Sequence, residues 1–219
     1  MKAKKILSQL LFTSLSFSIE WSESIVSTNL RKRTSESVLR RNIFVYPKKS
    51  FEWKSSLSNL CASTKPFKSV LKNVPAASPE FDHLLEPMEQ SCRSLDDRDS
   101  ISWLKNDIVK ACILYEIELK KIDSQAESKR LSFDLKLELL DKVMCPKFHV
   151  DKVPLRLLCT YIGPGTEWIE GAHVPRKFVE NGTIDDFICK NKMRFLKGEK
   201  EGCILLLRGN EWGVGHRSP

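Results

Sequence analysis

The chain has 219 residues, enough for one domain of ordinary size, and 41% of them are hydrophobic, as in globular proteins. Its formal net charge is +8. Residues 1–50 hold ten Lys or Arg against three Glu, a surplus of seven, so the other 169 residues are nearly neutral. This distribution argues against a nucleic-acid function for the protein as a whole.

The seven cysteines form an odd set without a CxxC pair, which excludes a zinc ribbon and a thioredoxin-type redox site. We expect them to be reduced residues of the core and the strands, which favours an intracellular location. They are Cys61, Cys92, Cys112, Cys145, Cys159, Cys189 and Cys203.

Residues 1–50 are basic, rich in Ser and poor in acids, and we predict that they form a leader separate from the domain. The semi-apolar stretch 6–19 is too short, and too often interrupted by Ser, to span a bilayer, so no transmembrane segment is predicted. Basic residues on both sides of this stretch are typical of an organellar transit peptide, and a disordered tail is the alternative. Residues 51–219 are predicted to form a single domain.

The helical part of this domain is expected over residues 78–125. A short helix is predicted over residues 81–92, and a longer amphipathic helix should begin after Asp99 or Ser100. In the longer helix apolar residues recur every three or four positions, which is the spacing of a packing face. These residues are Ile101, Leu104, Ile108, Cys112, Tyr115, Leu119 and Ile122.

The β part is expected over residues 130–219. Residues 131–139 alternate strictly between apolar and polar, which predicts a strand with one buried and one wet face. Residues 143–151, 155–162 and 203–207 also read as extended, separated by Gly and Pro turns. Helices followed by short strands predict an α+β protein, with its helices packed on a barrel or double-sheet jelly roll.

The candidate site begins at His149 and Asp151, which are two residues apart. Alternate residues of an extended chain point to the same side, so both side chains should enter one cavity. If His216 approaches them, two imidazoles and one carboxylate make a facial triad, which binds iron(II) and leaves coordination positions open. With Cys145 the same residues could instead hold zinc in a closed, structural tetrahedral site.

Several multi-residue blocks resemble one family, known as domain of unknown function 1826, over about residues 95–219. The blocks begin at Met144-Cys145-Pro146-Lys147-Phe148-His149-Val150-Asp151, continue through residues 155–168 and end with Gly209-Asn210-Glu211-Trp212 and Gly215-His216-Arg217-Ser218-Pro219. The family name implies no activity.

The HxD motif, the strand ending in Tyr161, the turn with Thr166 and the distal His216 also resemble iron(II)/2-oxoglutarate dioxygenases, which use a double-stranded β-helix. The resemblance implies that His149, Asp151 and His216 are the iron ligands and that Tyr161 and Thr166 line the cavity.

The co-substrate anchor of these enzymes is the main departure from the pattern. They usually hold the 2-oxoglutarate carboxylate with a basic residue on a strand after the distal His, and only three residues follow His216 here. Either Arg156 or Arg217 takes this role, or the sequence is truncated. We expect truncation, because a barrel that lacks a central strand exposes unpaired backbone edges.

The sequence therefore predicts a metal-binding protein, and specifically an iron(II)/2-oxoglutarate-dependent oxygenase acting on an unidentified small-molecule or protein substrate. Two alternatives remain open. The protein could be a non-catalytic scaffold whose basic leader engages an acidic partner or nucleic acid, or a degenerate oxygenase that binds metal without the co-substrate. The other histidines, His83 and His173, are expected at the surface.

Overall fold

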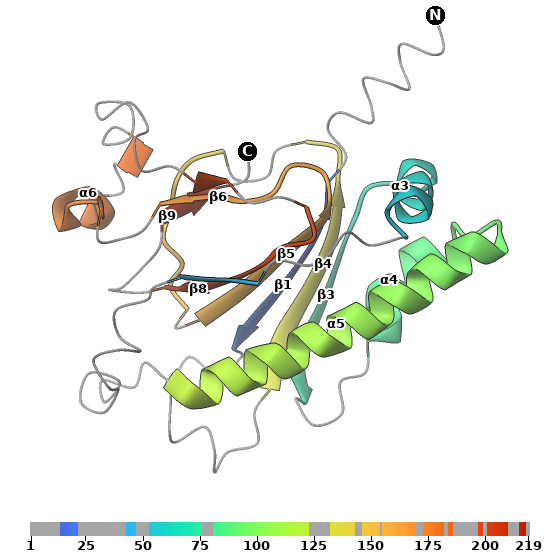
Figure 1. Cartoon of the computed structure of the whole chain (residues 1–219), viewed down its shortest axis with the longest axis horizontal. Helices are drawn as coiled ribbons and strands as arrows, with labels where there is room; N and C mark the ends of the chain where they lie inside the picture. Colours follow the sequence, from blue (N-terminus) through green and yellow to red (C-terminus); the bar gives the residue numbers. More distant parts are fainter. Residues whose placement is uncertain are drawn as a thin grey trace, which may run out of the picture.

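The structure is a computed structural model of the whole chain (Figure 1). The residues that it describes are 14–21, 43–46, 53–75, 81–122, 132–142, 146–153, 155–169, 173–181, 184–185, 197–198, 201–209 and 215–217.

The larger of the two sheets in the described residues has six antiparallel strands in the order β2-β8-β5-β1-β4-β3. In chain order its strands are β1 (Ser14–Trp21), β2 (Ile43–Tyr46), β3 (Phe67–Pro75), β4 (Ser132–Leu140), β5 (Leu155–Ile162) and β8 (Ile204–Arg208). The smaller sheet, in the order β7-β6-β9, is formed by β6 (Glu167–Ile169), β7 (Lys197–Gly198) and β9 (Gly215–Arg217). These strands form two open sheets, and neither the closed barrel nor the jelly roll that the sequence predicts is found among them.

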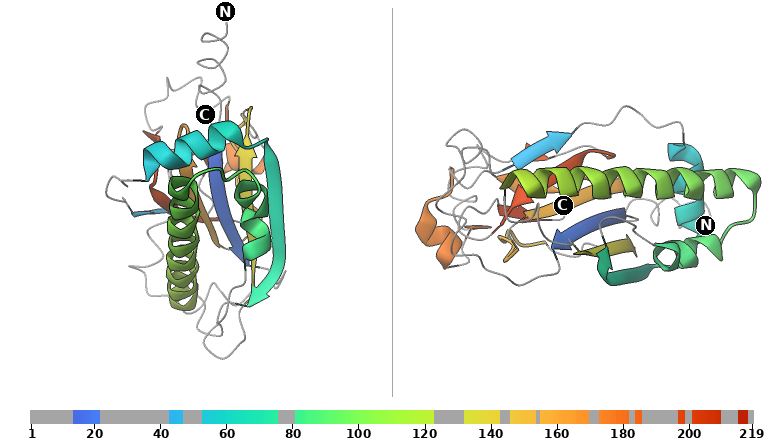
Figure 2. Two further views of the ribbon diagram at one scale, coloured as in Figure 1. Left: turned by 90° about the vertical axis from the view of Figure 1, so that its right-hand side faces the viewer. Right: turned by 90° about the horizontal axis from the view of Figure 1, so that it is seen from below.

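The helices are α3 (Lys54–Ser63), α4 (Asp82–Glu89), α5 (Leu95–Ile122) and the short α6 (Arg176–Glu180). Figure 2 shows α5 lying along the large sheet, with α3 and α4 beside it. The predicted long helix is confirmed, but it begins at Leu95, five or six residues earlier than expected. Ser94 Oγ accepts from the Asp97 amide, and Asp97 Oδ2 accepts from the amides of Arg93 and Ser94, so the reciprocal cap lies at Ser94.

The main core lies between the large sheet and the three helices α3, α4 and α5. The predicted alternation in β4 is confirmed as far as Leu137, because Phe133, Leu135 and Leu137 are fully buried on the helix-facing side. The other face is not the wet one expected, since its polar residues are only partly exposed and Glu138 is buried. Tyr115 of α5 meets the Phe133 ring edge to face, with 5.1 Å between the ring centroids. The combination of helices and antiparallel sheets confirms the predicted α+β class.

The small sheet packs on the other face of the large sheet. Trp168 of β6 forms a buried cluster with Leu205 and Leu207 of β8, joined by the partly buried Leu158 of β5. Since side chains alternate across a strand, Arg156 shares the face of Leu158, whereas Leu155, Leu157 and Tyr161 belong to the helix-facing core. The protein thus has a layer of helices, a large sheet and a small sheet.

Two parts of the predicted leader belong to the large sheet. Residues 14–21 form β1 and residues 43–46 form β2, so the sheet extends across the boundary expected at residue 50. Strand β1 lies between β4 and β5 and pairs with both, so these strands do not show the unpaired edges expected of a barrel without a central strand. The other residues of the 1–50 segment lie outside the described part, and targeting by it stays a prediction. The helices are also not confined to the predicted helical part, residues 78–125, because α3 and the strand that follows it, β3, both lie before residue 78.

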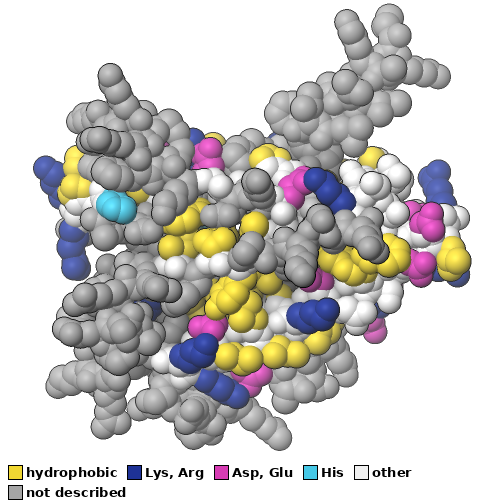
Figure 3. Space-filling view, in the orientation of Figure 1, with side chains coloured by type: hydrophobic (Ala, Val, Ile, Leu, Met, Phe, Trp, Pro, Cys, Tyr) yellow, Lys and Arg dark blue, Asp and Glu magenta, His cyan; other side chains and the backbone are white. Residues whose placement is uncertain are grey.

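Within the described residues, no helix combines the length and apolar character that crossing a membrane requires. Hydrophobic side chains are nevertheless visible on the face drawn in Figure 3, and Ile113 and Ile117 on the outer side of α5 are 52% and 47% exposed.

The buried thiols of Cys61 and Cys112 should be inert in the folded protein. Burial raises the pKa of each to about 12. At pH 7.5 that leaves roughly a thousandfold less thiolate than in a free cysteine. We expect neither residue to react with iodoacetamide within an hour in native buffer and both to react in 8 M urea, which peptide mass spectrometry can measure. Rapid alkylation of either thiol in the folded state would contradict their place in the core.

Candidate metal centre

His149 and His216 are brought together by the backbone. The His149 amide donates to the His216 carbonyl over 3.1 Å, and the His216 amide donates to the His149 carbonyl over 3.0 Å. The two residues are therefore directly opposite each other on antiparallel segments, where side chains share a face. Their ring centroids are 4.4 Å apart. On the other edge of β9, His216 pairs with Trp168, so residue 149 extends the small sheet by one position.

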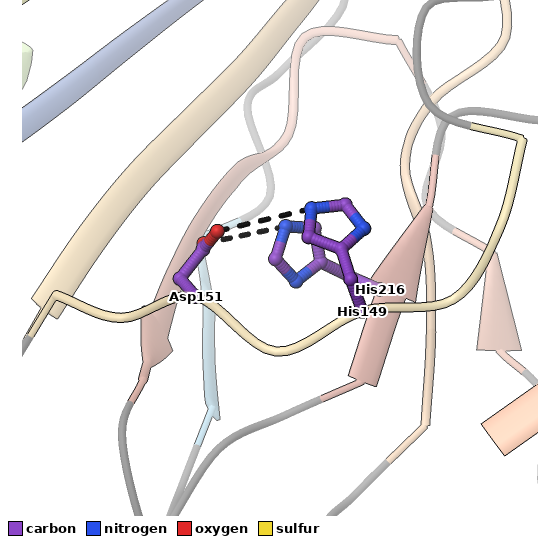
Figure 4. Close-up of side chains that lie close together, drawn as sticks. All are labelled: His149, Asp151 and His216. Carbon is purple, nitrogen blue, oxygen red and sulfur yellow. Dashed lines mark ion pairs between the residues drawn. The ribbon is translucent and has the colours of Figure 1, made fainter. Parts of the chain in front are cut away.

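Asp151 completes the cluster, as Figure 4 shows. Its Oδ2 lies 3.3 Å from Nε2 of His216, and its Oδ1 lies 3.8 Å from Nε2 of His149. One donor atom from each residue lies within 4.8 Å of the other two. The predicted convergence of the three side chains is thus confirmed as geometry. The ligand spacing of the sequence works because residues 149 and 151 lie on the same side of an extended segment.

The cluster is closed on one side and open on the other. Asp151 and His216 are buried, whereas the His149 side chain is 39% exposed. A buried carboxylate is costly unless it is paired or coordinates a metal. The inaccessible Oδ2 of Asp151 has one cationic partner, Arg156, and faces the His216 imidazole. Two imidazoles and a carboxylate around this atom fit a divalent cation, and the exposed side leaves room for further ligands.

Neighbouring groups orient the ligands. The Nε of Arg156 lies 2.9 Å from Asp151 Oδ2, an ion pair that holds the carboxylate between the guanidinium and the two imidazoles. The Nδ1 of His149 lies 3.1 Å from the Lys147 carbonyl. When Nδ1 carries the proton and donates to this carbonyl, the Nε2 lone pair faces Asp151, as in a metal-ligating imidazole.

Two further residues, which the sequence interpretation did not single out, fix the segment that carries the ligands. Gly209, the residue directly after β8, lies very close to the backbone of residues 151–153. A Cβ built on it would lie 2.1 Å from the Val153 carbonyl oxygen and 2.6 Å from that of Asp151. Asp185 accepts from the Phe148 amide over 3.2 Å. The glycine after an apolar strand was the available signal for the first contact, and no sequence signal pointed to the second.

Arg217 faces away from the cluster. Its Nε lies 2.6 Å from Glu167 Oε2, and its guanidinium stacks 4.6 Å from the centre of the Phe148 ring. Phe148 packs with Ile169 in a cluster beside α6. This is the outer face of the small sheet, whereas His149 and His216 are on the inner face.

Tyr161 does not line the cluster either. Its ring is fully buried in the helix-facing core, and its hydroxyl donates to Asp107 Oδ2 of α5 over 2.7 Å. Burial raises the pKa of this hydroxyl well above 10, and the negative charge of Asp107 adds to the effect. Thr166 is half-buried in the turn before β6. Of the four residues expected to bind a co-substrate, the structure places only Arg156 in contact with a predicted metal ligand. Cys145, needed for the closed zinc site, lies outside the described residues.

Comparison with known proteins gives a family but no described relative. No curated protein and no solved structure matches the chain. Residues 43–219 match the family described as "Protein of unknown function (DUF1826)". The match covers more than half of the chain, extends the resemblance seen from residue 95 onwards and includes all three members of the cluster. The chain therefore belongs to the DUF1826 family.

Proposed function

We propose that the protein binds a divalent transition metal, iron(II), through His149, Asp151 and His216. The observation that carries the proposal is the placement of three donor atoms within 4.8 Å of one another, with the Asp151 carboxylate and the His216 imidazole both buried. Two imidazoles and one carboxylate that leave one side open are the ligand set of a non-haem iron(II) centre. A closed zinc site would need a fourth protein ligand, for which the candidate, Cys145, lies outside the described residues.

The finer proposal is an iron(II)/2-oxoglutarate-dependent oxygenase. When bound, iron(II) would supply the means to activate dioxygen for oxidation of a substrate. The path of the chain is the supporting observation: β4, residue 149, β5 and β6 lie alternately in the large and the small sheet, as do β8 and β9 after β7, and the two sheets pack face to face through Trp168.

In this proposal Arg156 binds the carboxylate of the 2-oxo acid. Its guanidinium lies on the face of β5 toward the small sheet and beside Asp151, so it can hold an anion next to the ligands. Arg217 is the weaker candidate because it is paired with Glu167 on the outer face. The exposed edge of His149 is the side from which a substrate would approach.

Metal analysis of purified protein tests the site. After anaerobic loading with iron(II) and removal of excess, we expect one iron per wild-type chain. His149→Ala, Asp151→Ala and His216→Ala should each weaken binding roughly a hundredfold or more, because even second-shell changes cost about 10–100-fold. His173→Ala, which removes an exposed histidine, is the matched control and should retain full occupancy. Equal trace metal in every variant would refute the site.

A turnover assay tests the finer proposal. With ascorbate as reductant, the iron-loaded protein should slowly convert 2-oxoglutarate and dioxygen to succinate and carbon dioxide even without substrate, the second oxygen atom being reduced to water. Arg156→Ala should raise the 2-oxoglutarate concentration needed. Arg217→Ala should change it little. Stoichiometric iron without any 2-oxoglutarate binding would instead favour a degenerate enzyme.

A further inference from the structure

The centre of the large sheet is filled by a segment that lies outside the family match. Strand β1 ends at residue 21, whereas the match begins at residue 43. It pairs antiparallel with β4 from Ser14↔Leu140 to Trp21↔Phe133, and with β5 from Leu15↔Ile162 to Glu20↔Arg156. The family region by itself therefore leaves a gap one strand wide between β4 and β5.

This gap separates the two ends of the segment that carries the metal ligands. Since β4 and β5 are both antiparallel to β1, they run parallel to each other, and residues 141–154 connect them with His149 and Asp151 on the way. Without β1, the facing backbones of β4 and β5 would lie about 10 Å apart, twice the usual strand spacing. The facing edges of β4 and β5 would then expose unpaired N–H and C=O groups, with which an added strand could pair.

We propose that the gap between β4 and β5 is an acceptor site for an extended segment, that residues 14–21 are its detachable occupant, and that their insertion assembles the metal centre. Recognition is through the backbone on both sides. The sequence of β1 alternates Ser or Glu with Leu, Phe, Ile and Trp, so it suits a strand between two differing layers. Leu15 is buried in the helix-facing core, and Ser18, on the opposite face, is 4% exposed.

The chain length permits insertion and release. Residues 22–42 connect β1 to β2, and 21 residues can span up to about 70 Å when extended. Strand β1 can therefore leave the gap while β2 stays paired with β8.

The link to the metal centre, which rests on the proposed function, passes through the start of β5. Glu20 is the register partner of Arg156, and Arg156 contacts Asp151. Loss of β1 would free this end of β5, and with it the guanidinium that holds the Asp151 carboxylate.

A cross-strand disulfide tests the placement in the full-length protein. Phe17 is the register partner of Cys159, and facing residues of antiparallel strands have Cα atoms about 4.5–5.5 Å apart, within disulfide range. In Phe17→Cys, oxidised glutathione should join the two thiols and be reduced to two glutathione molecules, with peptide mass spectrometry showing an intramolecular 17–159 bond. Ile19→Cys, whose partner is Leu157, should form no 19–159 bond, and Phe17→Cys with Cys159→Ser should form no bond to residue 159. No 17–159 bond, or one that joins two chains, would overturn the assignment of β1 to its own sheet.

Strand exchange tests detachment. A specific protease site is introduced into residues 22–42 of the full chain and cut after folding. The nicked protein should then take up a fluorescent peptide of residues 12–23, and a scrambled peptide should not bind. In the oxidised Phe17→Cys variant uptake should stop. Absence of uptake within a day, with the cleaved segment still bound, would show that β1 is a permanent strand.

A proline in β1 tests the coupling to the metal. Ser18→Pro removes a backbone donor from a central strand and should weaken iron(II) binding at least tenfold, whereas Ser27→Pro, in the connecting residues, should not. Equal affinity of both variants would refute the coupling. If the wild type itself binds no iron, the proposed function fails, but disulfide formation and peptide exchange still decide the acceptor site.

Discussion

Replacing Gly209 with alanine is expected to lower the free energy of unfolding by about 2–4 kcal/mol and to weaken metal binding at least tenfold. A Cβ at this position would meet the backbone carbonyl oxygens of Val153 and Asp151 at 2.1 and 2.6 Å. No rotation of a side chain can relieve contacts with backbone atoms, so the segment after Asp151 must move away from β8. Because Asp151 belongs to that segment, the carboxylate should move with it.

Thermal unfolding and iron(II) titration measure the two effects, and a loss of this size corresponds to a decrease in Tm of roughly 4–16 °C. Gly198→Ala is the matched control, since a Cβ there would make only an ordinary 3.8 Å contact with Glu167. It should change neither quantity appreciably. An alanine at position 209 that leaves both unchanged would mean that the close approach of β8 to the ligand segment is absent in solution.

Truncating Tyr161 to alanine should cost about 3–5 kcal/mol of stability, as expected for a large buried ring. Tyr161→Phe should cost about 1–3 kcal/mol, because it removes the donor to the carboxylate of Asp107. Neither change should alter iron(II) affinity when measured on folded protein, since Tyr161 faces α5 rather than the small sheet. Urea unfolding at 25 °C and iron titration provide the two readouts.

Tyr115→Phe is the control for the loss of a hydroxyl. This hydroxyl donates to the neutral carbonyl of Leu155, so its loss should cost only about 0.5–1.5 kcal/mol.

The pKa of Tyr161 is raised in the folded protein, so the unfolded chain releases its proton first as pH rises. Its contribution to stability should therefore be complete below pH 10 and decline above it. A large decrease in metal affinity with full stability in Tyr161→Phe would place this residue at the site instead.

The sequence predicted those elements whose signal is local. The periodicity of residues 101–122 and the alternation of residues 131–139 identified α5 and β4, because burial on one face imposes a fixed spacing. The spacing of His149 and Asp151 placed both on one side in the same way. The approach of His216 depends on a pairing 67 residues away, which no local pattern specifies.

The errors have equally specific causes. Residues 14–21 alternate as a strand should, but their basic, Ser-rich surroundings favoured a leader, and their partners β4 and β5 are more than a hundred residues distant. Strand parity also argues against two of the expected site residues. Residues 156 and 161 differ by an odd number, so one strand cannot direct both into one cavity, and adjacent residues 216 and 217 likewise point to opposite faces.

The position of β1 also changes how the scaffold alternative can be tested. Deletion of residues 1–50 is the simplest way to separate a binding leader from a metal-binding body. It would remove both β1 and β2, so metal loss in that variant would not distinguish the two functions. Substitution of Lys or Arg within residues 31–41, outside the described strands, is the better comparison.

The antiparallel bridge between residues 149 and 216 has one more consequence. A cation held by both imidazoles would act as a clasp across a loop of 67 residues, in the manner of a covalent cross-link. Closing a long loop restricts the unfolded chain more than closing a short one. Binding of the cation would then protect the whole second half of the molecule, including β5, β6 and β8, against proteases and heat.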